Sequence, residues 1–238
     1  MAEIRLDDWL YETTSGTVQT GPFAGMKLPR EQAWKNGALC PMLLGCHEEE
    51  LHGAIEKEIA RLSRRKNPKI INVGCAEGYY AVGLARRLPF ATVWAIDTCD
   101  DCLRIAREAA ALNRVDLTIG ADLDETFAAP DLVVMDCEGA ESVYLDHARF
   151  PGLLRAHIIV EIHNTLAERN MSDVLWRRWG TNHHIVAYRE AGRDPNRFKV
   201  LQGLTSFWRW MAVCEGRPCT MFWLVMTPKR RGWLPWRS

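Results

Sequence analysis

The sequence has no net charge, no internal repeat, no low-complexity tract and no apolar run as long as a membrane span. Its 30 Lys and Arg residues balance 30 Asp and Glu residues. A balanced charge argues against a broad nucleic-acid-binding face. The lack of about 18 consecutive apolar residues argues against a transmembrane helix. We therefore expect no nucleic-acid partner and no membrane partner.

A second Cys-x-x-Cys pair is also missing. Of the eight cysteines, only Cys99 and Cys102 have this spacing, which does not indicate a four-cysteine zinc site. Residues 1–10 are acidic and lack the apolar segment of a signal peptide. We therefore expect a cytoplasmic protein whose thiols are reduced.

The composition that is present is that of a globular protein with a sizeable core. The chain has 238 residues, of which 47% are hydrophobic and 25% are charged, and this favours one large domain. We interpret residues 1–45 as an N-terminal arm or lid and residues 46–238 as the main domain. An insertion around residues 189–219 interrupts that domain.

Apolar periodicity predicts strands that alternate with helices. Strands are expected at 69–73, 92–96, 115–119, 131–135, 156–162, 183–188 and 220–226. Helices are expected at 46–66, 79–88, 101–112, 140–149, 170–180 and around 203–213. The alternation of strands and helices indicates a parallel sheet with helices on both faces. The last two predicted strands are joined without a clear crossover helix, which indicates that the last strand is antiparallel. The predicted fold class is a Rossmann-like α/β fold with a seven-stranded, mostly parallel sheet.

A loop of small residues follows the first predicted strand. Gly74, Ala76 and Gly78 stand at alternate positions immediately before a helix. Glycine lets a ligand lie against the backbone, and a helix N-terminus offers free N–H groups. A dinucleotide site would have a third glycine where Tyr79 stands, although Asp97 ends the next strand as a ribose-binding acid does. The loop therefore indicates a nucleotide-type cofactor without naming it.

The Gly-x-Ala-x-Gly spacing resembles the first motif of class I S-adenosylmethionine (SAM) methyltransferases, with Asn72 where that motif usually has an acid. Residues 134–141 (VMDCEGAE) and 159–163 (IVEIH) resemble the paired signature segments of FkbM-type methyltransferases. The resemblance covers about residues 40–165. It implies SAM as cofactor and O-methylation of a hydroxyl on a small molecule, natural product or saccharide.

The same resemblance implies roles for the acids at the strand ends. Asp97 would bond the ribose hydroxyls and Asp122 would meet the adenine amine. The cofactor-binding residues expected on this basis are Asn72, Gly74, Ala76, Glu77, Gly78, Tyr79, Asp97, Thr98, Asp122 and Asp136.

Three side chains at the ends of the fourth and fifth strands are candidates for catalysis: Asp136, Glu161 and His163. Glu161 and His163 alternate along the chain and should project to one side. His163 is the preferred general base, because its unperturbed pKa lies near working pH; a purely structural histidine is the alternative. The same three residues can instead hold a divalent cation such as Mg²⁺, which would lower the pKa of an acceptor oxygen. Glu141 is expected to face solvent.

Two other functions stay open beside SAM-dependent methyl transfer. One is an NAD-dependent oxidoreductase, and the other is a non-catalytic SAM-binding module. Residues 1–40 and 189–219 are expected to form the acceptor pocket. The tryptophan-rich C-terminal segment can cover the domain's own core or form the face of a homodimer.

Overall fold

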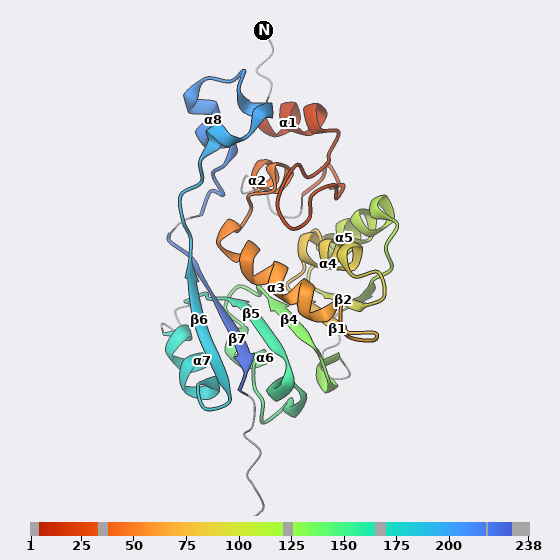
Figure 1. Cartoon of the computed structure of the whole chain (residues 1–238), viewed down its shortest axis with the longest axis vertical. Helices are drawn as coiled ribbons and strands as arrows, with labels where there is room; N and C mark the ends of the chain where they lie inside the picture. Colours follow the sequence, from red (N-terminus) through yellow and green to blue (C-terminus); the bar gives the residue numbers. More distant parts are fainter. Residues whose placement is uncertain (1–4, 33–37, 121–125, 165–169, 218, 230–238) are drawn as a thin grey trace, which may run out of the picture.

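The computed structural model describes residues 5–32, 38–120, 126–164, 170–217 and 219–229. Its centre is a seven-stranded sheet with the order β3-β2-β1-β4-β5-β7-β6 (Figure 1). The strands are β1 (Lys69–Val73), β2 (Thr92–Ile96), β3 (Thr118–Gly120), β4 (Leu132–Met135), β5 (His157–Glu161), β6 (His183–Arg189) and β7 (Phe222–Pro228). Strands β1 to β5 run parallel to one another, and β7 is antiparallel to both neighbours. The predicted fold class is confirmed.

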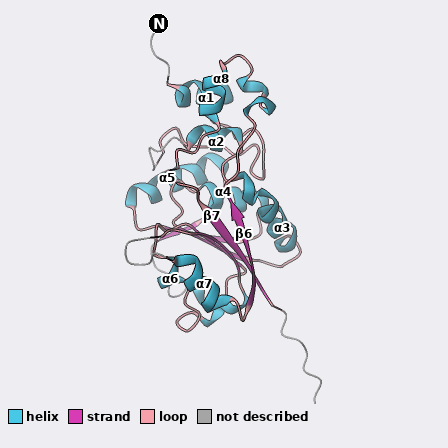
Figure 2. Cartoon of the chain, turned by 90° about the vertical axis from the view of Figure 1, so that its left-hand side faces the viewer, coloured by secondary structure: helices cyan, strands magenta, loops and turns pink. Residues whose placement is uncertain are grey.

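Helices cover both faces of this sheet (Figure 2). They are α1 (Leu6–Thr14), α2 (Leu39–Leu44), α3 (His52–Leu62), α4 (Tyr79–Arg87), α5 (Asp100–Asn113), α6 (Glu141–Tyr144), α7 (Met171–Trp179) and α8 (Ser206–Ala212). Helices α3, α4 and α5 lie on one face, and α6 and α7 lie on the other. No helix in the described ranges is long and apolar enough to cross a membrane.

Each central strand contributes alternate side chains to two separate cores. Along β1, Ile70 belongs to the core under α3, α4 and α5, whereas Ile71 and Val73 belong to the core under α6 and α7. This follows from the two-residue side-chain period of a strand. Nearly continuous apolar strands are therefore required, because both faces of a parallel sheet are buried. Asn72 of β1 breaks that rule, since it is polar and only 2% exposed.

The predicted helix over residues 46–66 is shorter in the structure. Glu48 adopts a left-handed backbone conformation with φ of 48°, which no helix interior permits. A single 3₁₀ turn (Glu49–Leu51) follows, and α3 begins only at His52 and ends at Leu62. The turn aims Glu48 toward the C-terminal edge of the sheet, and its side chain is buried there.

Two further elements are much shorter than the predicted ranges. The helix expected at 140–149 is a single turn, α6, because the Asp146 carboxylate accepts a hydrogen bond from the Ala148 N–H at 2.9 Å and favours a turn. The strand expected at 115–119 begins only at Thr118. Val115 is still engaged in the end of α5, where its N–H donates to the Ala110 carbonyl at 3.1 Å.

Helices α1, α2 and α8 gather at one end of the molecule, beyond the carboxyl ends of the parallel strands (Figure 1). Residues from the N-terminal region are part of the core: Leu10, Phe23 and Met26 are at most 3% exposed. Phe23 packs so closely on α4 that a Cβ atom at Gly83 would lie 2.5 Å from its ring. The division of the chain at residue 45 stays a proposal.

Candidate functional site

A cavity of about 560 Å³ lies at the carboxyl ends of β1, β2, β4 and β5. This is the edge of an open α/β sheet at which ligands bind, next to the point where the strand order reverses. The cavity is lined by all but two of the sequence-predicted site residues: Asn72, Gly74, Ala76, Glu77, Tyr79, Asp97, Thr98, Asp136, Glu161 and His163. The exceptions are Gly78, which stands at the N-terminus of α4, and Asp122, which lies outside the described residues.

The loop between β1 and α4 has three left-handed residues at alternate positions. The φ angles of Gly74, Ala76 and Gly78 are 69°, 45° and 83°. A Cβ atom on Gly74 would lie 1.6 Å from the Asp136 carbonyl oxygen, so a glycine is needed there for packing against the end of β4. The Gly74 and Cys75 N–H groups both donate to the Ile96 carbonyl, at 2.8 and 3.0 Å. The loop is therefore held by the backbone of the neighbouring strands.

Asp97 fixes the same loop from the end of β2. One carboxylate oxygen accepts a hydrogen bond from the Ala76 N–H at 2.9 Å, and the other accepts from the Cys99 N–H at 2.9 Å. A carboxylate has about four lone-pair positions, so each oxygen retains capacity for a ligand hydroxyl. Asp97 thus both shapes the loop and presents an acceptor at the cavity wall.

Asn72 lines the cavity with an unsatisfied acceptor. Its Nδ2 donates to the Val134 carbonyl at 3.3 Å, whereas its buried Oδ1 has no hydrogen-bond partner among the described residues. A buried amide oxygen without a donor costs stability. A ligand with an N–H or O–H group near this oxygen would remove that cost.

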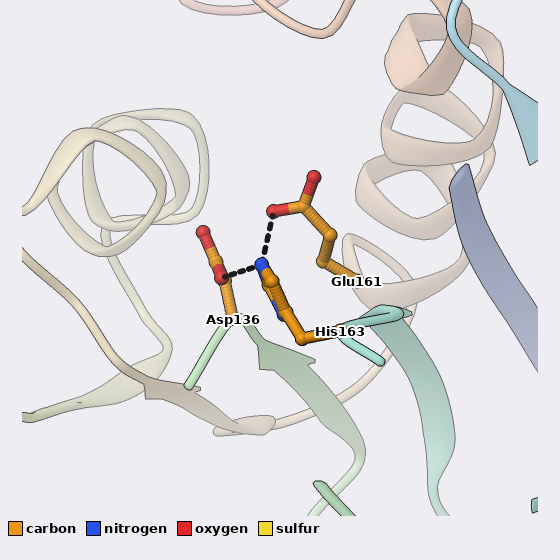
Figure 3. Close-up of side chains that lie close together, drawn as sticks. All are labelled: Asp136, Glu161 and His163. Atoms are coloured by element: carbon orange, nitrogen blue, oxygen red, sulfur yellow. Dashed lines mark ion pairs between the residues drawn. The ribbon is translucent and has the colours of Figure 1, made fainter. Parts of the chain in front are cut away.

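His163 stands at the opposite wall of the cavity, between acidic side chains (Figure 3). Its Nδ1 donates to Glu141 Oε1 at 2.8 Å, and Glu141 is fully buried. Its Nε2 lies 3.7 Å from both Asp136 Oδ1 and Glu161 Oε2. The expectation that Glu141 faces solvent is wrong, because α6 turns this side chain inward to meet the imidazole. A buried carboxylate on Nδ1 leaves Nε2 as the nitrogen that faces the cavity.

The acids around His163 perturb one another. Burial, and then the negative charge of Glu48, raise the pKa of Asp136 well above its usual range. Burial and the charge of Asp136 do the same to the pKa of Glu161. For His163 burial lowers the pKa, but the hydrogen bond to Glu141 and the charge of Glu161 outweigh it and the pKa is raised. Crowded carboxylates of this kind favour a proton or another cation between them.

A buried guanidinium, that of Arg217, lines the cavity next to Glu161, on the same side as His163. Arg217 Nη2 lies 2.6 Å from Glu48 Oε1, its Nε lies 2.8 Å from Glu215 Oε2, and its Nη1 pairs with Glu161. Glu215 is held again by Arg193 and by the Glu48 N–H, at 2.9 Å. Arg217 is therefore the cation that holds the segment before β7 against β5 and the turn before α3.

The sequence does not reveal this guanidinium network. Glu215 and Arg217 lie in a stretch without apolar periodicity, and the contact between Glu48 and Arg217 spans 169 residues. A sequence pattern reports neighbours along the chain, so it carries no signal for such a pair. Sequence reasoning could have identified Glu141 as a site residue, because Glu141 lies within the same VMDCEGAE segment as Asp136.

No family model matches the chain. The release factor glutamine methyltransferase of Flavobacterium psychrophilum is 46% identical over 70 residues, which are 29% of this chain and 25% of that protein. The release factor glutamine methyltransferase of Deinococcus radiodurans is 39% identical over 67 residues, which are 28% of this chain and 23% of that protein. The chain thus spans about a quarter of the length of the curated relatives it matches. The FkbM-type resemblance stays a prediction.

The crystal structure of an rRNA methylase from Streptococcus thermophilus has a TM-score of 0.50 with this chain, at 9% sequence identity. The match covers 76% of this chain and 97% of that one. The fold is a Rossmann-like methyltransferase fold. The cavity described above therefore lies where such a fold binds ligands, at the carboxyl ends of the parallel strands.

The relatives correct the expected acceptor. A small-molecule or saccharide acceptor without a nucleic-acid partner was predicted from the sequence. The curated relatives are named for a release factor, which is a protein, and the solved structure is named for rRNA. The prediction is wrong because it rested on the net charge and on the signature segments, and neither reports on what lies outside the cavity.

Proposed function

We propose that the chain is a SAM-dependent methyltransferase that modifies a side chain of a protein. One observation carries the proposal: a single cavity joins the left-handed loop and Asp97 to a histidine that is oriented by a buried glutamate. The first wall suits a nucleoside cofactor, and the second suits removal of a proton from an acceptor. SAM supplies a methyl group that is already activated on a sulfonium.

The cofactor wall fits SAM by its donor and acceptor groups. Asn72 Oδ1 is a buried acceptor that receives no hydrogen bond from any described residue, and SAM carries an ammonium group. Asp97 has spare lone pairs for ribose hydroxyls. Glu77, Tyr79 and Thr98 complete the wall. The third glycine of the dinucleotide fingerprint, which packs the helix against the strand beside a pyrophosphate, is replaced by Tyr79. These features favour SAM over NAD.

His163 is suited to take the proton that the acceptor loses. Glu141 holds Nδ1, so Nε2 faces the cavity with a free lone pair when the imidazole is neutral. The raised pKa makes the imidazole a stronger base but reduces its neutral fraction at lower pH. The acceptor atom can be a hydroxyl oxygen, as O-methylation requires, or a nitrogen. Mass spectrometry of the product identifies which atom is methylated.

A protein acceptor fits the charge of the cavity. Among the described residues, seven acids line it, and Arg217 is the only Lys or Arg residue that does: Glu48, Glu77, Asp97, Asp136, Glu138, Glu161 and Glu215. A neutral or cationic side chain enters such a field more easily than a phosphate does. The names of the curated relatives point to the same class of acceptor.

Calorimetric titration with SAM and with NAD tests the cofactor, and transfer of tritiated methyl from SAM to protein tests the activity. We expect SAM to bind and NAD not to bind. His163→Ala should lower kcat by about 10²- to 10⁴-fold while SAM binding is retained. Binding of NAD alone would contradict the proposal, and SAM binding without turnover would indicate a binding module.

A divalent cation at Asp136, Glu161 and His163 is a second candidate role for the same residues. Their ligand atoms all lie within 4.8 Å of one another, and Asp136 Oδ1 is buried without a hydrogen-bond partner in the part of the chain that the structure describes. A bound cation would lower the raised pKa values of both carboxyl groups. Titration with Mg²⁺ and Mn²⁺ decides this: binding that Asp136→Asn abolishes supports the metal, and full activity in a chelator contradicts it.

A further inference from the structure

A second cavity, of about 540 Å³, adjoins the first beyond Glu215, Gly216 and Arg217, which line both. Its other walls are residues 190–193, which follow β6, and the end of α8. It is more open to solvent than the first cavity, as a surface that receives part of a larger ligand is. The three consecutive residues Glu215 to Arg217 separate the second cavity from the side of the first cavity where Glu161 and His163 lie.

The wall between the two cavities is firmly held. Glu215 is 4% exposed and Arg193 is 7% exposed. The Arg193 guanidinium bonds the Cys46 carbonyl at 2.7 Å and Glu50 at 3.0 Å, and it also pairs with Glu215. Because these charges are buried and mutually paired, moving the wall would separate them at a large cost. The second cavity is therefore a preformed feature.

The outer side of the second cavity is apolar and exposed. Trp210 and Met211 line it and are 56% and 45% exposed. Phe207 and Trp208 extend the same helix surface and are 62% and 44% exposed. Large apolar side chains gathered on one short helix mark a binding surface. Tryptophan and methionine suit the contact of a varied apolar side chain.

We propose that the second cavity binds an apolar side chain of the acceptor protein, close in sequence to the residue that is methylated. An extended polypeptide places side chains i and i+2 on one face, about 7 Å apart. Such a segment lies across the Glu215–Arg217 wall with its methylated side chain in the first cavity and its apolar neighbour against Trp210 and Met211. The proposal rests on the proposed function.

The charge around the wall favours a polypeptide. Glu190 and Glu215 face the second cavity, and their charges are matched there by Arg193 and Arg217. The first cavity, into which the methylated group must reach, has an excess of acids. A polypeptide backbone is neutral and brings no phosphate past these carboxylates. The N–H groups of the backbone can also donate hydrogen bonds to these carboxylates.

Peptide arrays with tritiated SAM test this. The central residue is Gln, Asn, Ser, Thr, Lys or Arg, and the residue two positions away is Leu, Phe, Trp or Asp. Wild-type chain should methylate peptides with an apolar neighbour with a KM at least about tenfold below that of the Asp peptides. Met211→Asp should remove that preference without changing the affinity for SAM.

Trp176→Ala is the matched control, because Trp176 is an apolar side chain of α7 that is 48% exposed and lines neither of the two cavities. It should leave the KM and the preference unchanged. An unchanged preference in Met211→Asp, no methylation of any peptide while SAM binds, or label found only in RNA would each overturn the inference. Failure to bind SAM at all would instead overturn the proposed function.

Discussion

The two walls of the main cavity are built by different means. The half proposed to bind the methyl donor, called the donor half (Asn72, Gly74, Ala76 and Asp97), comes from a continuous stretch of about 25 residues, and backbone N–H groups hold it. The half proposed to bind the methyl acceptor, called the acceptor half (Asp136, Glu161, His163 and Arg217, with Glu141 behind His163), comes from three separate segments, and side-chain charges hold it.

This difference predicts different sensitivities. Backbone hydrogen bonds depend on conformation, so the donor half should respond to changes in φ and in side-chain volume. Ion pairs depend on protonation, so the acceptor half should respond to pH and to charge substitutions. Variants that separate the two responses test the comparison.

The largest effect is expected at Gly74. In Gly74→Val the side chain would have to occupy the space 1.6 Å from the Asp136 carbonyl, at a φ of +69°. We expect a loss of more than about 4 kcal/mol in the free energy of unfolding, or failure to fold. Urea denaturation measures the loss, and Gly74→Ala, which adds only the Cβ, should be the milder variant.

Ala76→Gly is the matched control, because Ala76 already has a φ of +45°. Glycine adopts that conformation without strain, so the variant should unfold within about 1 kcal/mol of wild type. A loss at Ala76→Gly equal to that at Gly74→Ala would show that the packing against β4 is not the cause.

Arg217→Met should have the next largest effect. It leaves Glu48, Glu161 and Glu215 buried together without their guanidinium. We expect a loss of about 3 kcal/mol, larger at pH 8 than at pH 5, because the carboxyl groups can take up protons at the lower pH. Chemical denaturation at the two pH values measures it.

The control is Arg197→Met, which removes a surface pair between Arg197 and Glu49 whose side chains are 40% and 31% exposed. Such a pair contributes about 0–1 kcal/mol. If both variants lose the same stability at both pH values, the acceptor half is not held by buried charge.

Glu141→Gln should affect turnover more than stability. The amide can still accept the His163 Nδ1–H, but it lacks the negative charge that raises the pKa of His163. The acid limb of the pH–rate profile should therefore shift to lower pH, and kcat should fall roughly ten- to a hundredfold. Glu138→Gln, at a side chain that is 65% exposed, should shift the limb less.

Asp136→Asn should give the smallest effect, seen as a change in the pH dependence of stability. Burial raises the pKa of Asp136 to about 8, so the folded state binds this proton more tightly than the unfolded state does. The stability that comes from protonated Asp136 is therefore present at acidic pH and is lost as the pH rises toward about 8.

The asparagine variant should gain about 1 kcal/mol over wild type at pH 8, after allowance for a side chain that is 35% exposed. Thermal unfolding between pH 5 and pH 9 measures the difference. Parallel stability curves for the two proteins would show that Asp136 is ionised throughout this range.

The backbone elements that carry the donor half were predicted from the sequence because their determinants are local. The strand ranges 69–73 and 92–96 agree with β1 and β2, and Asp97 reaches Ala76 as a residue at the end of β2 should. The reason for Gly74 was not predictable, because the atom that excludes a side chain belongs to Asp136, and that contact exists only once β4 lies beside β1.

The acceptor half was predicted only in part. Asp136, Glu161 and His163 were placed together from their positions at strand ends, and the structure brings them together. The orientation of His163 was not predicted, since it depends on a glutamate that was expected in solvent. The predicted acceptor class was wrong, because net charge and the signature segments do not report on what lies outside the cavity.

The sequence by itself determined the order of strands and helices along the chain, the position of the small-residue loop and the acids at the strand ends. Apolar periodicity and glycine placement act over a few residues, so they can be recognised without the fold. Only the tertiary structure decided that Arg217 closes the site, that Glu141 orients His163 and that a second cavity adjoins the first. Those features depend on charges brought together from distant segments, which become close only when the sheet and its covering helices are formed.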